Sequence, residues 1–244
     1  MALLKRSKKP ETRDMPRQSA PDVAPLPAWI RWGRWGVPLV ALLLIGGVVA
    51  FTRSQSSVPL EFKGGAVVSS RQQAPDFTLT DHNGQTQQLS SFRGRPVALT
   101  FVYTNCIDIC PLIAWNMHLA YEQLGGDANK IALLAVTVDP ERDTPAQMRA
   151  FSETRQLTNQ WHFLTGVRPA LERVWRAYGI QTQGVDSDGN VIPESDIANA
   201  KPAQIEHAAP MFLIDKQGNV RMLLPIDFAP ETLVHNMKVL LAES

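Results

Sequence analysis

The stretch VALTFVYTNCIDICPLIAWNMHLAYEQL, residues 97–124, joins a strand pattern, a cysteine pair and a helix pattern. Residues 97–103 are almost continuously apolar, as in a strand that is buried on both faces of a parallel sheet. Residues 112–124 have a helical pattern that ends at a Gly-Gly pair, a common helix stop signal. Cys106 and Cys110 lie between the two. The stretch therefore predicts a strand–loop–helix unit with both cysteines close to the start of the helix.

The rest of the chain after residue 74 alternates strand and helix patterns. The predicted elements are strands at 77–80, 86–89, 131–138, 161–164, 211–214 and 220–224, and helices at 145–154, 168–178 and 230–241. The first two strands flank an Asn-Gly turn signal, and a loop-rich insertion is expected over 181–204. This order predicts an α/β, thioredoxin-like fold with a mixed central sheet, an added N-terminal β-hairpin and an insertion before the last hairpin.

Composition excludes some classes of function. The chain has 244 residues, 44% of them hydrophobic and 19% charged, with a formal net charge of +1. Residues 1–34 contain eight basic and three acidic residues, whereas residues 35–244 contain 16 basic and 20 acidic ones. A mildly acidic body argues against binding to a phosphate backbone, so we expect no nucleic-acid partner.

A membrane anchor is expected near the N-terminus. Residues 36–52 contain no charge, three tryptophans precede them, and the basic residues are concentrated on the N-terminal side. A span of this length just crosses a hydrocarbon core, and the charge bias places the N-terminus in the cytoplasm. A cleaved signal peptide is the rival interpretation, although a leading region of about 35 residues is long for one.

These patterns divide the chain into four segments. We expect a largely disordered cytoplasmic tail at 1–34, a transmembrane helix at 35–52, a linker at 53–73 and one folded domain at 74–244. The predicted location is the bacterial inner membrane, crossed once, with the domain in the periplasm. The mitochondrial inner membrane is the alternative.

The spacing of the two cysteines indicates chemistry. Residues four apart at a helix start project to the same face, with Cα atoms roughly 6 Å apart. A helix N-terminus favours thiolates, and two soft thiolates suit Cu(I) or Zn(II). The same pair can also cycle between dithiol and disulfide. A plain stabilising disulfide is the third interpretation, but it would close only a very short ring.

Three motifs resemble the Sco/SenC family of membrane-anchored copper-delivery proteins. They are Thr104-Asn-Cys-Ile-Asp-Ile-Cys-Pro111, Val138-Asp-Pro-Glu-Arg-Asp-Thr-Pro145, and Glu206-His207 followed by Met211-Phe-Leu-Ile-Asp215. The resemblance spans about residues 35–241. It implies that Cys106, Cys110 and His207 bind one copper ion, Cu(I) or Cu(II), for delivery to the dinuclear copper centre of cytochrome c oxidase subunit II.

The chain departs from the family pattern at two positions. Ile107 stands where the family usually has proline, and Pro210 stands where it usually has an aliphatic residue. Thioredoxins have a cis-proline at the strand start that corresponds to Pro210, so this residue favours redox chemistry. Neither departure removes an expected metal ligand.

Other polar residues have simpler interpretations. His82, His162 and His235 are expected to be structural or solvated, and His118 is expected to be a weak substitute ligand because it lies off the face of Cys110. Asp108 could tune the thiolates, dock a partner or be a solvated loop acid, and Asp139 ends a strand on the cysteine side, where it could belong to the site or to a structural Asp-Pro turn. Residues 186–190 are expected to form a turn and not a calcium loop.

Two functions therefore remain open, with a weaker third. The leading hypothesis is a copper metallochaperone, which is not an enzyme. The alternative is a thiol-disulfide oxidoreductase in which Cys106 and Cys110 are the catalytic pair. A peroxiredoxin is disfavoured, since its Thr-x-x-Cys spacing is replaced here by Thr-x-Cys.

Overall fold

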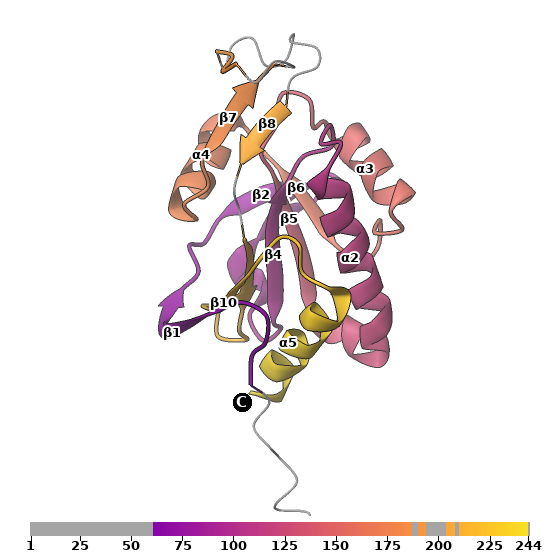
Figure 1. The fold of residues 1–244 in the computed structure, drawn as a ribbon, viewed down its shortest axis with the longest axis vertical. Helices are drawn as coiled ribbons and strands as arrows, with labels where there is room; N and C mark the ends of the chain where they lie inside the picture. The colour runs from indigo at the N-terminus through magenta and orange to yellow at the C-terminus, as the bar shows by residue number, and fades with distance from the viewer. Residues whose placement is uncertain (1–60, 187–189, 194–203, 208–209, 244) are drawn as a thin grey trace, which may run out of the picture. The chain divides into compact units, whose positions relative to one another are not determined.

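The structure is a computed structural model that describes residues 61–186, 190–193, 204–207 and 210–243. An eight-stranded sheet forms its centre, in the order β1-β10-β9-β4-β5-β6-β2-β3 (Figure 1). The strands of this sheet are β1 (Ala66–Gln73), β2 (Thr78–Asp81), β3 (Thr86–Gln88), β4 (Val97–Val102), β5 (Ala132–Thr137), β6 (His162–Thr165), β9 (Met211–Ile214) and β10 (Asn219–Leu224). A second sheet pairs β7 (Thr182–Val185) with β8 (Gln204–His207).

The central sheet is mixed, as the sequence predicts. Strands β4, β5 and β6 are parallel neighbours, and β9 pairs antiparallel with β4 on the other side. Every residue of β4 and β5 is buried, which explains why their sequences are continuous apolar runs and not alternating ones. The parallel order directs the carboxyl ends of β4 and β5 to the same edge of the sheet.

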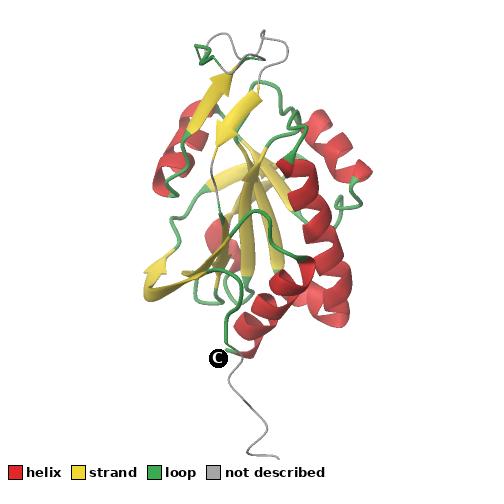
Figure 2. Cartoon of the chain, in the orientation of Figure 1, coloured by secondary structure: helices red, strands yellow, loops and turns green. Residues whose placement is uncertain are grey.

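Helices lie on both sides of the strands (Figure 2). The helices are α2 (Ile109–Leu124), α3 (Pro145–Thr154), α4 (Arg168–Ala177) and α5 (Pro230–Ala242), with short 3-10 turns η1 (Leu89–Phe92) and η2 (Gly125–Lys130). Figure 1 shows α2 beside α5 and α4 across the sheet from them. The rings of Phe101, Tyr178 and Phe212 pack together on the sheet, with centroids 5.0–6.1 Å apart.

The predicted N-terminal hairpin is confirmed. Strands β2 and β3 pair antiparallel across a turn in which Gly84 has a φ of 80°. The carboxylate of Asp81 closes this turn, because its Oδ1 accepts hydrogen bonds from the backbone N–H groups of Asn83 and Gln85, each at 2.9 Å. The turn uses glycine where a side chain would be strained.

The linker predicted at 53–73 is too long, because its last eight residues, 66–73, form strand β1. This strand pairs antiparallel with β10 and extends the sheet. Its low hydrophobicity has a physical reason: seven of its eight residues are exposed, so it is bound mainly by backbone hydrogen bonds. Gly65 also has a packing role, because a Cβ there would lie 2.5 Å from the carbonyl oxygen of Leu223.

The insertion predicted as loop-rich over 181–204 contains strand β7 and the start of β8. Figure 1 shows this two-stranded sheet at the end of the molecule where α2 begins. Two of its side chains attach it to the domain, since Val185 is buried and Ile192 packs against the core. The insertion therefore adds structure at the cysteine end of the sheet.

The predicted transmembrane segment, residues 35–52, lies outside the described residues. Within the described ranges, none of the helices has the length and apolar character that crossing a membrane requires.

Candidate metal and redox site

Cys106 and Cys110 come together where β4 meets α2. Cys106 lies in the connecting loop, and Cys110 is the second residue of α2. The helix begins at Ile109, three residues before the start that the sequence predicts. The backbone N–H of Cys110 donates a hydrogen bond to Sγ of Cys106 across 3.4 Å. Neither of these two cysteines forms a disulfide. The helix therefore starts by directing a backbone donor at the first sulfur.

Access to the two sulfurs is unequal. Cys110 is fully buried, whereas Cys106 retains 8% of its surface. A partner or a metal ion therefore reaches the pair through Cys106, with Cys110 behind it. This order is set by the fold, since Cys110 faces the core from the first turn of α2.

The two thiols have opposite pKa shifts. The hydrogen bond from the Cys110 thiol, helped by backbone N–H groups of Cys110 and Asp108, lowers the pKa of Cys106 to about 5 against the opposing effect of burial. The same hydrogen bond, together with burial and the negative charge of Cys106, raises the pKa of Cys110. At neutral pH the site therefore holds one thiolate and one thiol that stabilises it.

A buried carboxylate holds the cysteine loop in place through hydrogen bonds. Asp143 accepts hydrogen bonds from both the backbone N–H (3.0 Å) and the hydroxyl of Thr104, and from the hydroxyl of Thr137 at 2.5 Å. Burial raises the pKa of Asp143 to about 6, in spite of these donors. The residue joins the cysteine loop to the end of β5. Sequence reasoning assigned it no role, although it lies in the family-like block 138–145.

Asp139 begins the same block and is fully buried. Its Oδ2 forms an ion pair with Arg142, and its backbone N–H donates to the hydroxyl of Thr137 at 2.9 Å. Burial raises the pKa of Asp139. Its predicted position at a strand end is confirmed, and its contacts give it a structural role beside Asp143.

Arg155 was also missed by sequence reasoning. Its guanidinium stacks 3.7 Å from the ring centroid of Phe151, at the end of α3. Burial lowers the pKa of Arg155, and the negative charge of the cysteine pair opposes this shift. A fixed cation therefore acts on the thiolate from a second element.

His207, the third expected ligand, ends strand β8. Its backbone pairs with Thr182 of β7, and its side chain lies outside what the structure describes. Pro210 directly precedes β9, the strand that adjoins β4 in the sheet. The described side chains contain no group of three or more histidine, cysteine or acidic residues arranged to hold a metal ion. The ligand role of His207 therefore stays a prediction.

The other histidines have protein partners. His118 is buried, and its Nδ1 lies 2.9 Å from Oε1 of Gln160. His82 is buried with Nε2 3.1 Å from the carbonyl oxygen of Thr158. His162 pairs with the carboxylate of Asp81, and His235 contacts the carbonyl oxygen of Glu61. The structural or solvated roles predicted for His82, His162 and His235 fit these contacts, and His118, predicted as a weak substitute ligand, is occupied by Gln160.

The two remaining acidic candidates differ in their contacts. Asp108 is exposed at the N-cap of α2 without a side-chain capping bond. The carboxylate of Asp186 accepts hydrogen bonds from the backbone and side-chain nitrogens of Asn190, as in the predicted turn.

Three large apolar side chains are exposed in and after the cysteine loop. Ile107, between the two cysteines, is 82% exposed, and Leu112 and Trp115 on the first turns of α2 are also exposed. We call these three residues the apolar rim. Burial of such side chains stabilises association with a partner, so this face is suited to contact another protein.

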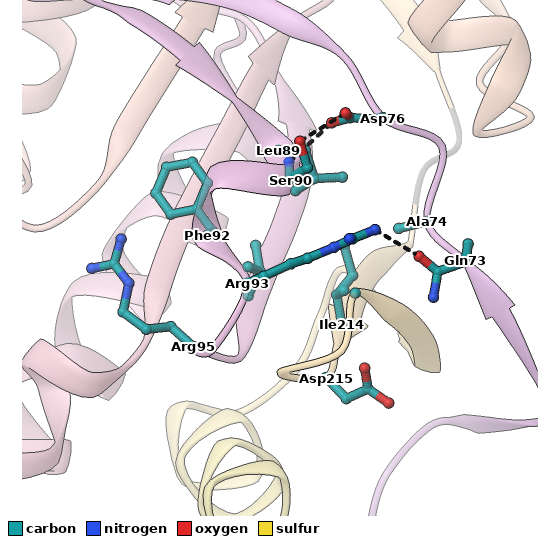
Figure 3. A pocket seen from close by; sticks show the side chains of 12 residues that line it. Gln73, Ala74, Asp76, Leu89, Ser90, Phe92, Arg93, Arg95, Ile214 and Asp215 are labelled. Atoms are coloured by element: carbon teal, nitrogen blue, oxygen red, sulfur yellow. Dashed lines mark hydrogen bonds between the residues drawn. The ribbon is translucent and has the colours of Figure 1, made fainter.

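A pocket at the other end of the sheet is too small to be a substrate site. Figure 3 shows its lining, in which Arg93 donates to Gln73 and Asp76 accepts from Ser90. Its volume is about 30 Å³, room for about two water molecules. The cysteine pair is therefore the better candidate for a site with reactive or metal-binding side chains.

A family comparison agrees with this geometry. The model of the SCO1/SenC family matches residues 67–242. The chain belongs to the SCO1/SenC family. The match includes the cysteine loop, the Asp139–Asp143 block and His207, and it begins within β1. The SCO1/SenC domain therefore includes the strand that the sequence predicted as linker.

Relatives of this SCO1/SenC chain are distant. The mitochondrial SCO2 homologue of Bos taurus is 33% identical over 127 residues, 50% of this chain and 47% of that protein. The chain spans about half the length of the first curated relatives that it matches.

Solved structures share the fold. The copper-bound ScoI of Bradyrhizobium japonicum is 28% identical, with a TM-score of 0.56 over 68% of this chain and 98% of that one. BsSco is described as having a disulfide switch and as a member of the Sco family of cytochrome c oxidase assembly proteins. It is 19% identical, with a TM-score of 0.54 over 75% of this chain and 99% of that one, and shows the fold alone.

Proposed function

We propose that this protein is a membrane-anchored copper metallochaperone that binds one copper ion through Cys106, Cys110 and His207. The observation behind the proposal is the sulfur pair at the start of α2, with a thiolate at Cys106 and a thiol at Cys110. Two soft sulfur donors on one face fit Cu(I), and a neutral imidazole adds a third ligand of suitable chemistry. Copper is the cargo here, so the site must release it as well as bind it.

Partial exposure supports transfer. Cys106 reaches the surface and Cys110 does not, so an acceptor's ligands approach the metal from one side. The apolar rim around Cys106 provides contact area for that acceptor. By resemblance to the family, the acceptor is the dinuclear copper centre of cytochrome c oxidase subunit II.

Copper binding by the full chain in detergent tests the ligand set. The reduced protein should bind one Cu(I), and the oxidised protein should lose tight binding. Cys106→Ser or Cys110→Ser should abolish tight binding, since each leaves a single thiolate. His207→Ala should weaken binding and retain a two-sulfur site, whereas the matched variant His118→Ala should bind as the parent does. If His207→Ala binds copper with the affinity of the parent, His207 is not the third ligand.

Reporter fusions test the anchored topology separately. Alkaline phosphatase fused after Ser244 should be active in a bacterial host, and a cytoplasmic reporter at the same position should be silent. The opposite pattern would reverse the proposed orientation, in which the domain lies in the periplasm.

A thiol-disulfide oxidoreductase is the second candidate, favoured by the low pKa of Cys106. The Cys106 thiolate would attack a disulfide of an acceptor protein and release one acceptor thiolate. Cys110 would then lose its proton, attack Cys106 and release the second thiol, so that two electrons pass from the cysteine pair to the acceptor.

Copper-free assays separate the two candidates. An oxidoreductase should reduce an oxidised acceptor catalytically without copper when an external thiol reductant regenerates it, and Cys110→Ser should trap a mixed disulfide at Cys106. A metallochaperone should instead transfer copper stoichiometrically. Metal-free turnover without copper transfer would favour the second candidate.

A further inference from the structure

A basic groove of about 600 Å³ lies at the end of the domain away from the cysteines. Its charged lining consists of Arg95, Lys130, Lys216, Lys238 and a single acidic residue, Asp127. We call these five residues the basic groove. Arg95 precedes β4, Lys130 ends η2, Lys216 follows β9 and Lys238 lies on α5, so four separate segments bring their cations to one place.

Arg95, Lys216 and Lys238 form no ion pair with an acidic side chain in the part of the chain that the structure describes. Lys130 pairs with Asp127 at 2.7 Å, and the Lys216 ammonium donates to the carbonyl oxygens of Leu241 and Glu243. The Arg95 guanidinium lies 5.2 Å from the ring centroid of Phe92. Figure 3 shows it pointing away from the bonded pair of Arg93 and Gln73.

Lys238 is the other cation and is exposed on α5. The two carbonyl oxygens that accept hydrogen bonds from Lys216 carry no formal charge. The groove therefore keeps an excess of positive charge on a body that is acidic as a whole.

The groove and the cysteine site lie at opposite ends of the domain. Strand β4 begins two residues after Arg95 and ends just before the cysteine loop. Helix α2 then runs back for 16 residues, about 24 Å at the rise of an α-helix, to η2 and Lys130. A surface bound at the groove therefore leaves the cysteine loop facing away from it.

The described chain also enters the domain at the groove end. The carbonyl oxygen of Glu61 lies 2.8 Å from Nε2 of His235. The backbone N–H of Lys63 donates to the side chain of Asn236 at 2.9 Å, and the Asn236 amide donates back at 2.8 Å. Both contacts are on α5 within one turn of Lys238.

The short connection to the predicted anchor limits where this end can lie. The anchor is predicted to end at residue 52, nine residues before Glu61. Even a fully extended connection of that length spans at most about 30 Å. If the anchor crosses the membrane, a connection of this length keeps the first described residues of the domain within reach of its surface.

We propose that the basic groove binds the anionic headgroups of the membrane that holds the anchor. The inference rests on the anchored topology of the proposed function. Lysine and arginine side chains near an anionic leaflet are attracted to its surface, and each adds to the binding. Docking in this way would hold the cysteine loop at the membrane-distal end, where an acceptor domain has access to it.

Amide hydrogen exchange of the full chain in nanodiscs tests this proposal. One set of discs contains phosphatidylcholine alone, and the other contains phosphatidylcholine with phosphatidylglycerol. Exchange over residues 125–130 and 238–242 should be slower in the anionic discs, and 0.5 M salt should remove the difference because it screens the charges. Exchange of β5 serves as the internal reference.

Two matched variants complete the test. Arg95→Gln/Lys238→Gln should lose the protection in anionic discs. Arg173→Gln/Arg176→Gln, which removes two exposed cations from α4, should retain it. Equal exchange in both disc types, or equal loss in both variants, would overturn the proposal. Failure of the chain to insert into neutral discs would instead reject the anchor, so the two failures are distinguishable.

Discussion

The carboxylate of Asp143 binds Thr104 twice, at its backbone N–H and at its hydroxyl. Thr104 lies two residues before Cys106, and Asp143 lies beyond the end of β5, so the contact joins the cysteine loop to a neighbouring strand. A third donor, the hydroxyl of Thr137, completes the set. The shape of the loop that presents Cys106 therefore depends on one buried acidic side chain.

Asp143→Ala should destabilise the domain and loosen the cysteine loop. The change leaves three donors without their acceptor in a buried place, and an unsatisfied buried donor costs about 1–3 kcal/mol. We expect a loss of at least about 3 kcal/mol in the free energy of unfolding, measured by urea denaturation. Glu153→Ala, at an exposed helix position, is the control and should unfold as the parent does. A parent-like midpoint for Asp143→Ala would contradict this role.

The raised pKa of Asp143 predicts a pH-dependent contribution to stability. Its pKa is raised from 3.8 to about 6, so the folded state retains a proton that the unfolded chain loses between these values. Stability from this group is present below pH 3.8 and declines as pH rises to about 6, by up to about 3 kcal/mol.

Comparison with Asp143→Asn isolates this effect, because asparagine does not titrate. The difference in unfolding free energy between parent and variant should shift in favour of the variant from pH 4 to pH 6 and stay constant above. A constant difference across this range would show that the pKa is not raised.

Cys106 should react as a thiolate in mildly acidic solution. In the metal-free, reduced protein, its alkylation by iodoacetamide should increase with pH around a midpoint of about 5, because the Cys110 thiol stabilises the thiolate. Cys110→Ala removes this donor and should raise the midpoint, whereas the hydroxyl of Cys110→Ser should give an intermediate value. Peptide mass spectrometry measures the rates. A midpoint near 8.5, the ordinary value for cysteine, would contradict the assignment.

Cu(I) affinity should rise about tenfold per pH unit between pH 7 and 9. Over this range Cys106 is already ionised, while the raised pKa of Cys110 keeps its proton in place until the metal displaces it. Competition with a chromophoric chelator measures the slope. A hundredfold rise in Cu(I) affinity per pH unit would mean that both thiols are protonated before the metal binds. An affinity that does not change with pH would mean that both are already ionised.

Ile107→Ser should slow copper transfer without changing copper affinity. This side chain is 82% exposed next to Cys106, so its burial by an acceptor would favour the encounter. We expect the rate of transfer to the soluble domain of subunit II to fall about tenfold. Val67→Ser, which removes a 54% exposed apolar side chain from the edge strand β1, is the matched control. Equal transfer rates for Ile107→Ser and the parent would exclude the apolar rim as a docking surface.

Much of the fold follows from local sequence patterns. The apolar runs of β4 and β5 predict buried parallel strands because both faces of such strands lack water. Thr144 followed by proline predicts the start of α3, and the Thr144 hydroxyl does accept a hydrogen bond from the backbone N–H of Gln147. The cysteine pair at the start of a helix was likewise evident from spacing alone.

Tertiary structure decided what depends on partners distant in the sequence. Strand β1 has no apolar pattern, because backbone pairing with β10 is what holds it in the sheet. The role of Asp143 depends on Thr104, 39 residues earlier, and only the parallel pairing of β4 with β5 brings them together. The unequal burial of Cys106 and Cys110 has the same origin. Spacing along a chain predicts which face a side chain shares, but burial and hydrogen bonding depend on what the fold places opposite it.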